Sequence, residues 1–296
     1  MELSQPDQIL KVLEEAASLN RQDSFREGHL LKFPNYGQVI MTGDIHGYGA
    51  NFQRLRQYAD LDRQIHRHVI IHEIIHTNGT NGQPAAPDKP TDEDASSLIL
   101  FQAAQWKVDY PDQVHFLLGN HDLAQITNRE ISKGGIPSIA QFNQWITDRF
   151  GQDPGEKILR RIDDFLGSVP LAAKCANRIW LSHSLPGPVG MNFFDFSIFH
   201  REWTADDLVP KGSVYELVWG RAHQLNQLQE LGEFLDVDHF IVGHQGQEQG
   251  FDTVDERVII LASDHAMGCF LPIDLNKKYT FRELVERVKF FCDLPE

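Results

Sequence analysis

The sequence predicts an α/β protein whose strands and helices form layers in one domain. Apolar strand patterns alternate with helical patterns in the first half, and strand patterns dominate the second half, which is typical of layered α/β folds. The chain has 296 residues, of which 41% are hydrophobic, so it can bury a sizeable core. No internal repeat and no linker divides it, and we therefore expect residues 1–296 to form a single domain.

The first half is expected to begin with a helix over residues 5–20, because Ile9, Leu13 and Ala16 recur at helical spacing. Residues 77–94 are rich in Gly, Pro, Asn and Asp, a composition that predicts an exposed, mobile loop. The other elements expected in this half are strands within 38–47, 67–75 and 113–118, and helices over 51–59, 94–106, 121–131, 138–149 and 155–166.

The second half is expected to contain short strands and a few helices. Thr280 and Glu283 form a capping box, which predicts a last helix that extends to about Phe291. The other expected elements are strands over 178–181, 240–242, 258–261 and 269–272, and a helix over 222–234.

The composition disfavours several classes of protein. The formal charge is -15, from 42 acidic and 27 basic residues, whereas nucleic-acid and anionic-membrane binders need a basic face. Cys175, Cys269 and Cys292 are widely spaced, which indicates a reducing, cytoplasmic location and no zinc knuckle. The acidic, amphipathic start predicts neither a signal nor a transit peptide, and no apolar run has membrane-spanning length. The oligomeric state stays open.

One segment reads HEIIH and fits the zinc-peptidase pattern H-E-x-x-H. His72 and His76 can share a zinc ion only in a helix, where they lie about 6 Å apart along the axis. In a strand the same residues are about 13 Å apart. The surrounding β-branched residues favour a strand, which the turn signal Thr77-Asn78-Gly79 ends. A zinc peptidase is therefore the less favoured alternative.

Side chains of metal-binding type follow or end five apolar strands. Ligand sites in layered α/β folds collect at the carboxyl ends of strands, so we expect these side chains to converge. Oxygen and nitrogen donors without thiolates suit Mn²⁺, Fe or Zn²⁺, and their number exceeds the needs of one tetrahedral ion. The candidates for a site with two ions, with Mn²⁺ as the first choice, are Asp44, His46, Glu73, Asn120, His183 and His244.

Four motifs occur in a characteristic order, namely GDIHG, LLGNHD, LSHS and VGHQ. Together they resemble the calcineurin-like metallophosphoesterases, and GDIHG and GHQ are particularly similar to the branch of Ser/Thr protein phosphatases and bacterial diadenosine tetraphosphatases. The resemblance extends from about residue 38 to about residue 275. It implies two β-sheets packed face to face and flanked by helices.

The resemblance also implies a dinuclear-metal-dependent phosphoesterase that hydrolyses phosphate esters, of phosphoprotein or nucleotide type, by a metal-bound hydroxide. Asp44 and His46 would bind the first ion. Asn120, His183 and His244 would mainly bind the second, and Asn120 would also contact the substrate.

Three further residues are expected to act on the substrate. His121 would be the general acid that protonates the leaving oxygen. Arg221, in LVWGR, is the expected phosphate clamp, and a plain surface arginine is the alternative. His265, in ASDHAMG, falls where the family often lines the pocket, or is structural.

The second motif of the family, G-D-x-x-D-R-G, is altered in this chain, and HEIIH occupies its place. The substituted positions, in order, are His72 for the glycine, Glu73 for the bridging aspartate, His76 for the second aspartate, Thr77 for the arginine and Asn78 for the final glycine. HEIIH is then explained as a divergent phosphatase motif. In the family the second aspartate orients the acid histidine and the arginine clamps phosphate, so this chain lacks that carboxylate and that cation at the positions of His76 and Thr77.

That loss leaves a metal-binding protein without catalysis as a second alternative. In such a protein residues 193–199, FFDFSIF, would form an apolar docking patch for a partner. Packing in the core is the other explanation for these phenylalanines, and the better supported one.

Overall fold

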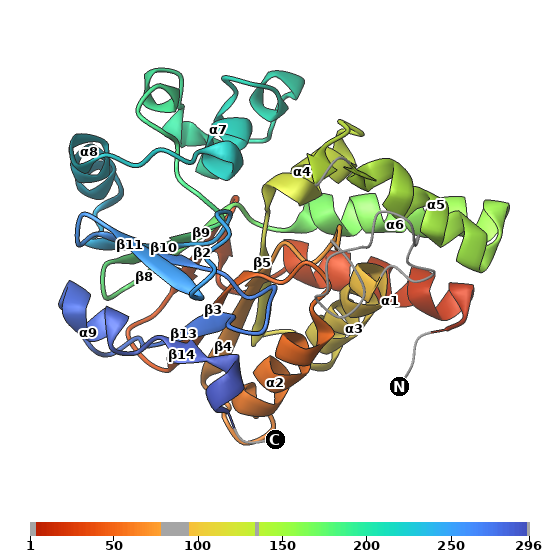
Figure 1. The fold of residues 1–296 in the computed structure, drawn as a ribbon, viewed down its shortest axis with the longest axis horizontal. Coiled ribbons are helices and arrows are strands. Elements are labelled where there is room, and N and C mark those ends of the chain that lie inside the picture. The colour runs from red at the N-terminus through yellow and green to blue at the C-terminus, as the bar shows by residue number, and fades with distance from the viewer. Residues whose placement is uncertain (1–3, 78–94, 134–135, 295–296) are drawn as a thin grey trace.

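The computed structural model describes residues 4–77, 95–133 and 136–294. Figure 1 shows strands in the middle of the molecule with helices on both sides. No helix in the described ranges combines the length and the apolar character that a membrane crossing needs. The segment 78–94, for which a mobile loop is predicted, lies outside the described residues.

Among the described residues, two large mixed sheets form the centre of the fold, which confirms the predicted α/β architecture with two packed sheets. One sheet has the strand order β14-β13-β3-β4-β5 and the other β1-β2-β8-β9-β10-β12-β11. The strands of the first sheet are β3 (Gln38–Asp44), β4 (Arg67–His72), β5 (Val114–Leu117), β13 (Cys269–Asp274) and β14 (Lys289–Phe290). Those of the second are β1 (Arg26–Glu27), β2 (Leu30–Phe33), β8 (Ala172–Cys175), β9 (Ile179–Ser182), β10 (His239–Val242), β11 (Phe251–Val254) and β12 (Val258–Leu261).

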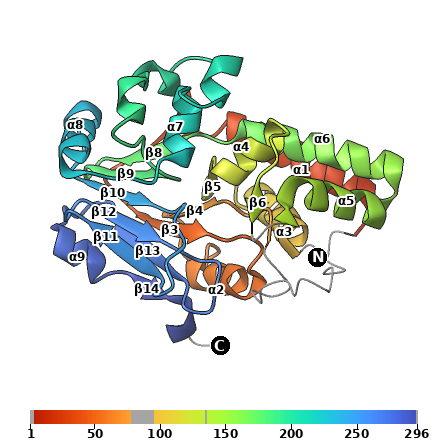
Figure 2. The same cartoon turned by 45° about the horizontal axis from the view of Figure 1, so that its top comes forward.

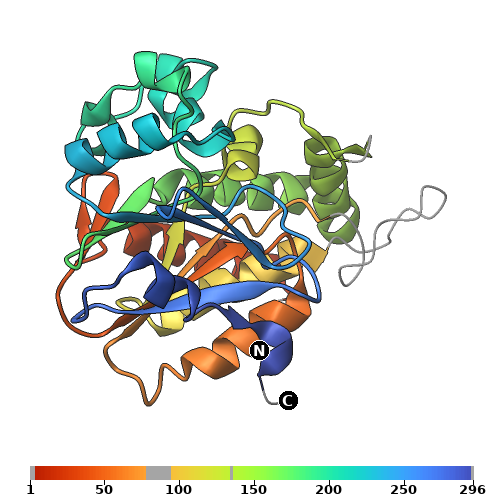
Figure 3. The same ribbon diagram turned by 60° about the vertical axis from the view of Figure 1, so that its left-hand side comes forward.

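Helices cover the outer faces of the sheets. Figures 1 and 2 place α1, α3, α5 and α6 together on one side of the molecule, and α2 lies below the first sheet. Figure 3 shows the segment between β9 and α8, coloured green to cyan, as a layer above the sheets. The described α-helices are α1 (Pro6–Arg21), α2 (Gly49–Ala59), α3 (Ala95–Asp109), α4 (Asn120–Ile126), α5 (Ser138–Phe150), α6 (Gln152–Ser168), α7 (Ser213–Trp219), α8 (Leu225–Leu235) and α9 (Phe281–Val285).

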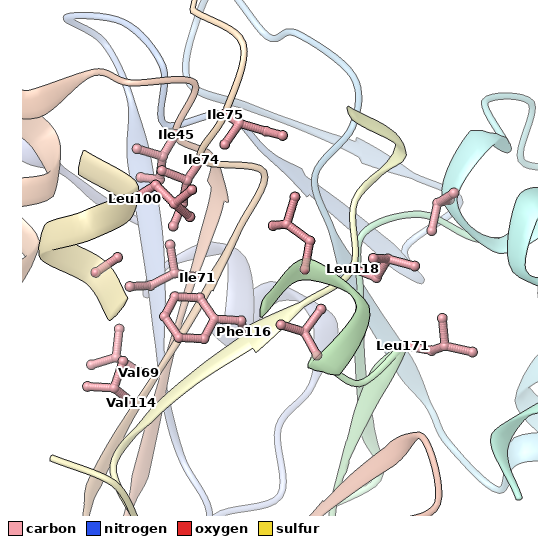
Figure 4. Close-up of a cluster of buried hydrophobic side chains, with 14 of the residues drawn as sticks. Ile45, Val69, Ile71, Ile74, Ile75, Leu100, Val114, Phe116, Leu118 and Leu171 are labelled. Atoms are coloured by element: carbon pink, nitrogen blue, oxygen red, sulfur yellow. The ribbon is translucent and has the colours of Figure 1, made fainter. Parts of the chain in front are cut away.

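Alternation along the strands divides the core into two apolar clusters. Met41 and Ile70 face the space between the two sheets, whereas Val69 and Ile71 belong to the cluster that packs against the helices. Figure 4 shows this second cluster, with Leu100 of α3 beside the β4 side chains. Since β3 and β4 are buried on both faces, they read as continuous apolar runs.

The main strand predictions are correct in place, but several boundaries are wrong. The last helix, predicted to reach Phe291, ends at Val285, because the following residues turn back and Phe290 pairs with Cys269 of β13. The strand predicted over 67–75 ends at His72, because Glu73 turns into the left-handed region with φ of 49°. These errors come from long-range pairing and tertiary contacts, which a local pattern does not contain.

The phenylalanine-rich segment 193–199 packs mostly into the core. Phe194, Ile198 and Phe199 are buried, and only Phe193 among its large apolar residues is prominently exposed. The segment is therefore mainly a structural one, as the core-packing explanation predicts.

Six strand ends meet at one edge of the two sheets. β3, β4 and β5 are parallel to one another, and β10 is parallel to both β9 and β12. An isolated parallel bridge between Asp44 and Ala262 links the two sheets where β3 and β12 end. The loops that follow these strands therefore surround one common space.

Candidate metal centre

A polar cavity of about 370 Å³ lies at this common edge. It contains three carboxylates and one guanidinium among its described lining residues. Those residues are Asp44, His46, Glu73, Asn120, His121, Arg221, His244, Gln245, Gly246, Ala262 and Asp264. Six of the residues predicted from the sequence for metal or substrate binding, and the predicted acid His121, are therefore part of one cavity wall.

Backbone N–H groups hold the two central carboxylates in place. His244 N donates to Asp44 Oδ1 at 3.0 Å, and His121 N donates to Glu73 Oε1 at 2.6 Å. The Glu73 carbonyl also accepts from Ile45 N and His46 N, at 3.0 and 2.9 Å. β3, β4 and α4 thus fix Glu73 by both its backbone and its side chain.

Two glycines let the loops approach these carboxylates. A Cβ at Gly243 would lie 2.5 Å from Asp44 Oδ1, and a Cβ at Gly119 would lie 2.6 Å from Glu73 Oε1. Both distances are shorter than real carbon–oxygen contacts, so any side chain at these positions displaces a carboxylate.

Three ligand-type side chains converge beside Glu73. His183 Nε2 lies 2.9 Å from Asn120 Oδ1, 3.1 Å from His244 Nδ1 and 3.4 Å from Glu73 Oε2. Asn120 Oδ1 is 2.7 Å from His244 Nδ1. Turning the amide over would let its nitrogen donate to both imidazoles, but with the oxygen inward these lone pairs converge as metal ligands do.

The potential ligand atoms fall into three groups with mutual separations of up to 4.8 Å. The members are Asp44, His72 and His183 in one, His46, Glu73 and His121 in another, and Glu73, His183 and His244 in the third. Glu73 belongs to two of them, which is the position a bridging carboxylate requires. The residues present therefore fit a site for divalent cations.

The ring nitrogens of His46 and His244 have different hydrogen-bonding surroundings. His46 Nδ1 donates to Ile75 O at 2.9 Å, so that Nε2 is the nitrogen that faces Glu73, 3.7 Å from its Oε2. A metal-binding histidine usually donates its other ring N–H in this way. His244 Nε2 is buried and has no hydrogen-bond partner among the described residues.

Burial keeps the imidazoles of His72, His183 and His244 neutral. It lowers the pKa of His72 and of His244 to about 3, and the pKa of His183 well below 6.5. Neighbouring imidazoles lower the pKa of His183 further, and Arg221 with neighbouring imidazoles lowers that of His244. Neutral imidazoles can bind a cation, because they keep one nitrogen lone pair.

The HEIIH segment is not a helix, so the zinc-peptidase alternative is wrong. β4 ends at His72, and residues 73–77 continue as irregular backbone. Ile74 and Ile75 are buried in the apolar cluster beside α3, and the two histidines reach different partners. His72 Nδ1 lies 3.1 Å from His183 Nδ1, and His76 Nδ1 lies 3.1 Å from His121 Nδ1.

Two of the predicted substrate-binding residues have different surroundings. Arg221 lines the cavity, and its guanidinium donates to His244 O at 3.3 Å. His265 is not among the described lining residues. Its Nε2 lies 2.9 Å from Gln247 O, and its Nδ1 accepts from Met267 N at 3.2 Å.

Sequence reasoning did not include Asp264, which lines the cavity. It follows β12 by three residues, so the rule that ligands follow strand ends would have found it. The contacts of His72 and His76 with other imidazoles were also missed. Nothing in the local sequence indicates them, because the partners lie more than forty positions away along the chain.

Solved structures share this fold. The yeast protein serine/threonine phosphatase with similarity to human phosphatase PP5 superposes with a TM-score of 0.69 at 13% identity, over 91% of this chain and 82% of that chain. The cold-active protein-tyrosine phosphatase of a psychrophilic Shewanella species superposes with a TM-score of 0.51 at 16% identity, over 83% of this chain and 77% of that chain. No curated protein sequence matches the chain.

The fold and its polar cavity place the chain among the α/β proteins that bring metal-ligand side chains together at strand ends. The sequence profile of the calcineurin-like phosphoesterases matches residues 37–248. The chain belongs to this family, which confirms the resemblance of its four motifs.

Proposed function

We propose that this chain is a phosphatase that hydrolyses phosphate esters with the help of two divalent cations. The observation that carries the proposal is the position of Glu73 in two groups of ligand atoms, one with His46 and the other with His183 and His244. A carboxylate shared in this way can hold two cations about 3.5–4 Å apart.

The residues that would hold the ions are assigned from this geometry together with the resembling motifs. Glu73 shares one group of ligand atoms with His46 and another with His183 and His244, which also contact Asn120. Asp44 is grouped with His72 and His183, and the resemblance of GDIHG assigns it to the first ion together with His46. When bound, divalent cations lower the pKa of a water molecule and neutralise charge on the phosphoryl oxygens. The donor set contains no thiolate, which suits Mn²⁺, Fe or Zn²⁺.

The proton and the phosphate group are assigned to His121 and Arg221. In hydrolysis the oxygen of water forms a bond to phosphorus while the ester P–O bond breaks. The leaving oxygen takes a proton from His121, whose ring is in the cavity wall. Arg221 would pair with the phosphoryl oxygens as a charged clamp.

The substrate is expected to carry a phosphate ester on a protein or a nucleotide. Arg221 is the one cationic side chain among the described lining residues, beside the carboxylates of Asp44, Glu73 and Asp264. This balance favours a phosphate group of low charge over a polyphosphate chain. A cytoplasmic location rests only on the unpaired cysteines and stays a prediction.

A metal-binding protein without catalysis is the alternative. It is favoured by Thr77, which supplies no charge where the resembling motif has an arginine. The contact between His76 and His121 argues for the active form, because it supplies the acid histidine with a hydrogen-bonding partner.

A substrate panel with the Mn²⁺-loaded protein tests the proposal. The panel contains 4-nitrophenyl phosphate, phosphoserine and phosphotyrosine peptides, a nucleoside monophosphate and a dinucleoside polyphosphate. We expect turnover of at least one monoester, loss of turnover in EDTA and recovery with Mn²⁺. Two bound ions per chain with no turnover of any compound would instead indicate the non-catalytic alternative.

A further inference from the structure

His76 forms a direct contact with the proposed acid, His121. Their Nδ1 atoms lie 3.1 Å apart, and both side chains are buried. Two ring nitrogens at this distance form a hydrogen bond only if one carries a proton and the other does not. The direction of this bond decides which nitrogen of His121 is available in the cavity.

Gln125 determines that direction. His76 Nε2 lies 3.0 Å from Gln125 Oε1, and Gln125 Nε2 donates to Asn143 Oδ1 at 2.9 Å. The amide oxygen of Gln125 therefore faces His76 and can only accept. A neutral His76 then carries its proton on Nε2 and offers the lone pair of Nδ1. His121 donates its Nδ1–H to this lone pair, so Nε2 is the nitrogen that takes up a second proton, in the imidazolium form, and gives it to the leaving oxygen.

The surroundings of His76 hold its ring in this position. The ring packs edge-on against Phe142, with centroids 5.3 Å apart, and His76 N donates to Ser96 Oγ at 3.1 Å. The backbone of His76 has φ of 64°, in the left-handed region that is unfavourable for a non-glycine residue. Backbone strain of this kind persists where surrounding contacts enforce it and collects at functional sites.

We propose that His76, supported by Gln125, is a positioning residue that fixes the ring orientation and the tautomer of His121. It thereby takes the role that an aspartate has in the resembling motif, with an imidazole lone pair in place of a carboxylate. The proposal rests on the proposed function, because it concerns the acid of that reaction. It assigns to His76 no contact with the substrate.

Steady-state kinetics on two aryl phosphates test this role. Phenyl phosphate has a poor leaving group and needs the proton, whereas 4-nitrophenyl phosphate has a good one and hardly needs it. For His76→Leu we expect kcat on phenyl phosphate to fall by roughly 10²-fold, the scale of a misplaced general acid. On 4-nitrophenyl phosphate kcat should change by less than about fivefold. KM and metal content should stay unchanged, because His76 is assigned no contact with the substrate or the ions.

Two further variants separate positioning from stability. His76→Asp supplies a different acceptor to His121 Nδ1, and we expect it to recover most of the lost turnover of phenyl phosphate. His68→Asn is the matched control, because His68 is a buried histidine of β4, the strand that precedes His76, and it contacts His115 outside the cavity wall. Equal losses on both substrates, or no rescue by His76→Asp, would overturn the proposal.

Nuclear magnetic resonance of the imidazole nitrogens tests the proposal without any activity. In the ¹⁵N-labelled protein loaded with diamagnetic Zn²⁺, we expect a protonated Nε2 on His76 and a protonated Nδ1 on His121. Gln125→Leu should remove this preference on His76. A wild-type His76 with its proton on Nδ1 would refute the inference even if the protein hydrolysed no phosphate, an outcome that would count separately against the proposed function.

Discussion

The Nδ1 atoms of His72 and His183 lie 3.1 Å apart inside the protein, and His72 Nε2 donates to Thr42 O at 2.8 Å. Since this carbonyl can only accept, neutral His72 has its proton on Nε2 and accepts from His183 Nδ1–H. His183 is then left with a bare Nε2, which points at Asn120 and Glu73. Each of the two histidines of HEIIH thus contacts the imidazole of another residue, His72 that of His183 and His76 that of His121.

His72→Leu is therefore expected to weaken metal binding without removing a ligand. Loss of a partner that fixes the tautomer of a metal-binding histidine typically lowers metal affinity by about 10–100-fold. Metal per chain after dialysis against a graded series of chelator measures the effect, with His68→Asn as the control. Unchanged affinity in the variant, with the fold intact by circular dichroism, would rule out this role of His72.

Glu73→Gln removes the shared charge at nearly constant volume. We expect metal content to fall from two ions per chain towards one or none, because a bridging carboxylate offsets the repulsion between the ions. Glu73→Asp restores the residue of the resembling motif and should be milder. Elemental analysis of the purified variants gives the answer, and retention of both ions by the Gln variant would refute bridging.

His121→Ala is expected to keep its metal and lose turnover. For a substrate with a poor leaving group the loss should be roughly 10²–10⁴-fold, the usual contribution of a general acid. His121 also shares a ligand group with His46 and Glu73, so metal content must be measured on the same sample. A fall in metal content would make His121 a ligand instead of the acid.

Gly243→Ala should disturb the centre through packing alone. The added Cβ would lie 2.5 Å from Asp44 Oδ1 and from His72 Cε1, so the carboxylate or the loop must move. We expect reduced metal content and turnover. Gly167→Ala is the control, because nothing lies within 4 Å of its added Cβ. Since Gly167 lies in helix α6, this substitution should raise the free energy of unfolding by about 0.5–1 kcal/mol. Urea unfolding and metal analysis of both variants test the pair.

A second buried network, far from the cavity, predicts how stability depends on pH. His68 Nδ1 contacts His115 Nε2 at 3.1 Å, His115 Nδ1 pairs with Asp23 Oδ2 at 2.7 Å, and Lys107 pairs with the same oxygen at 2.9 Å. Burial, followed by the charges of His115 and His66, lowers the pKa of His68 to about 3, and Asp23 partly opposes this shift. The pKa of Asp23 is also lowered, by its bonds to His115 and Lys107 against the effect of burial.

Stability should therefore fall as the solution becomes acidic. Below pH 6.5 the unfolded chain takes up a proton on His68, whereas the folded chain stays neutral there until about pH 3, so each step downward favours unfolding. Between pH 7 and pH 5, protonation of His68 in the unfolded chain lowers the free energy of unfolding by about 2 kcal/mol. His68→Asn keeps a hydrogen-bonding group but does not titrate. Urea unfolding at both pH values should show a smaller loss in the variant, and equal losses would contradict the assignment.

The residues that end apolar strands could be predicted from the sequence, because a run such as QVIMTG or HFIVG both forms a buried strand and points its next residue at the sheet edge. Asp44, Asn120 and His244 were located in this way, and the structure places all three in one cavity wall. Strand identity and the side-chain period of two are local properties, so no tertiary information was needed for this step.

Only the tertiary structure decided what His72 and His76 do. The left-handed turn at Glu73 ends β4 three residues before the predicted strand end. His72 contacts His183, directly after β9, and His76 contacts His121 of α4. Their partners, His183 and His121, lie 111 and 45 positions further along the chain. Such contacts depend on how two sheets and a helix pack together, and this packing cannot be predicted from the residue pattern of a single segment.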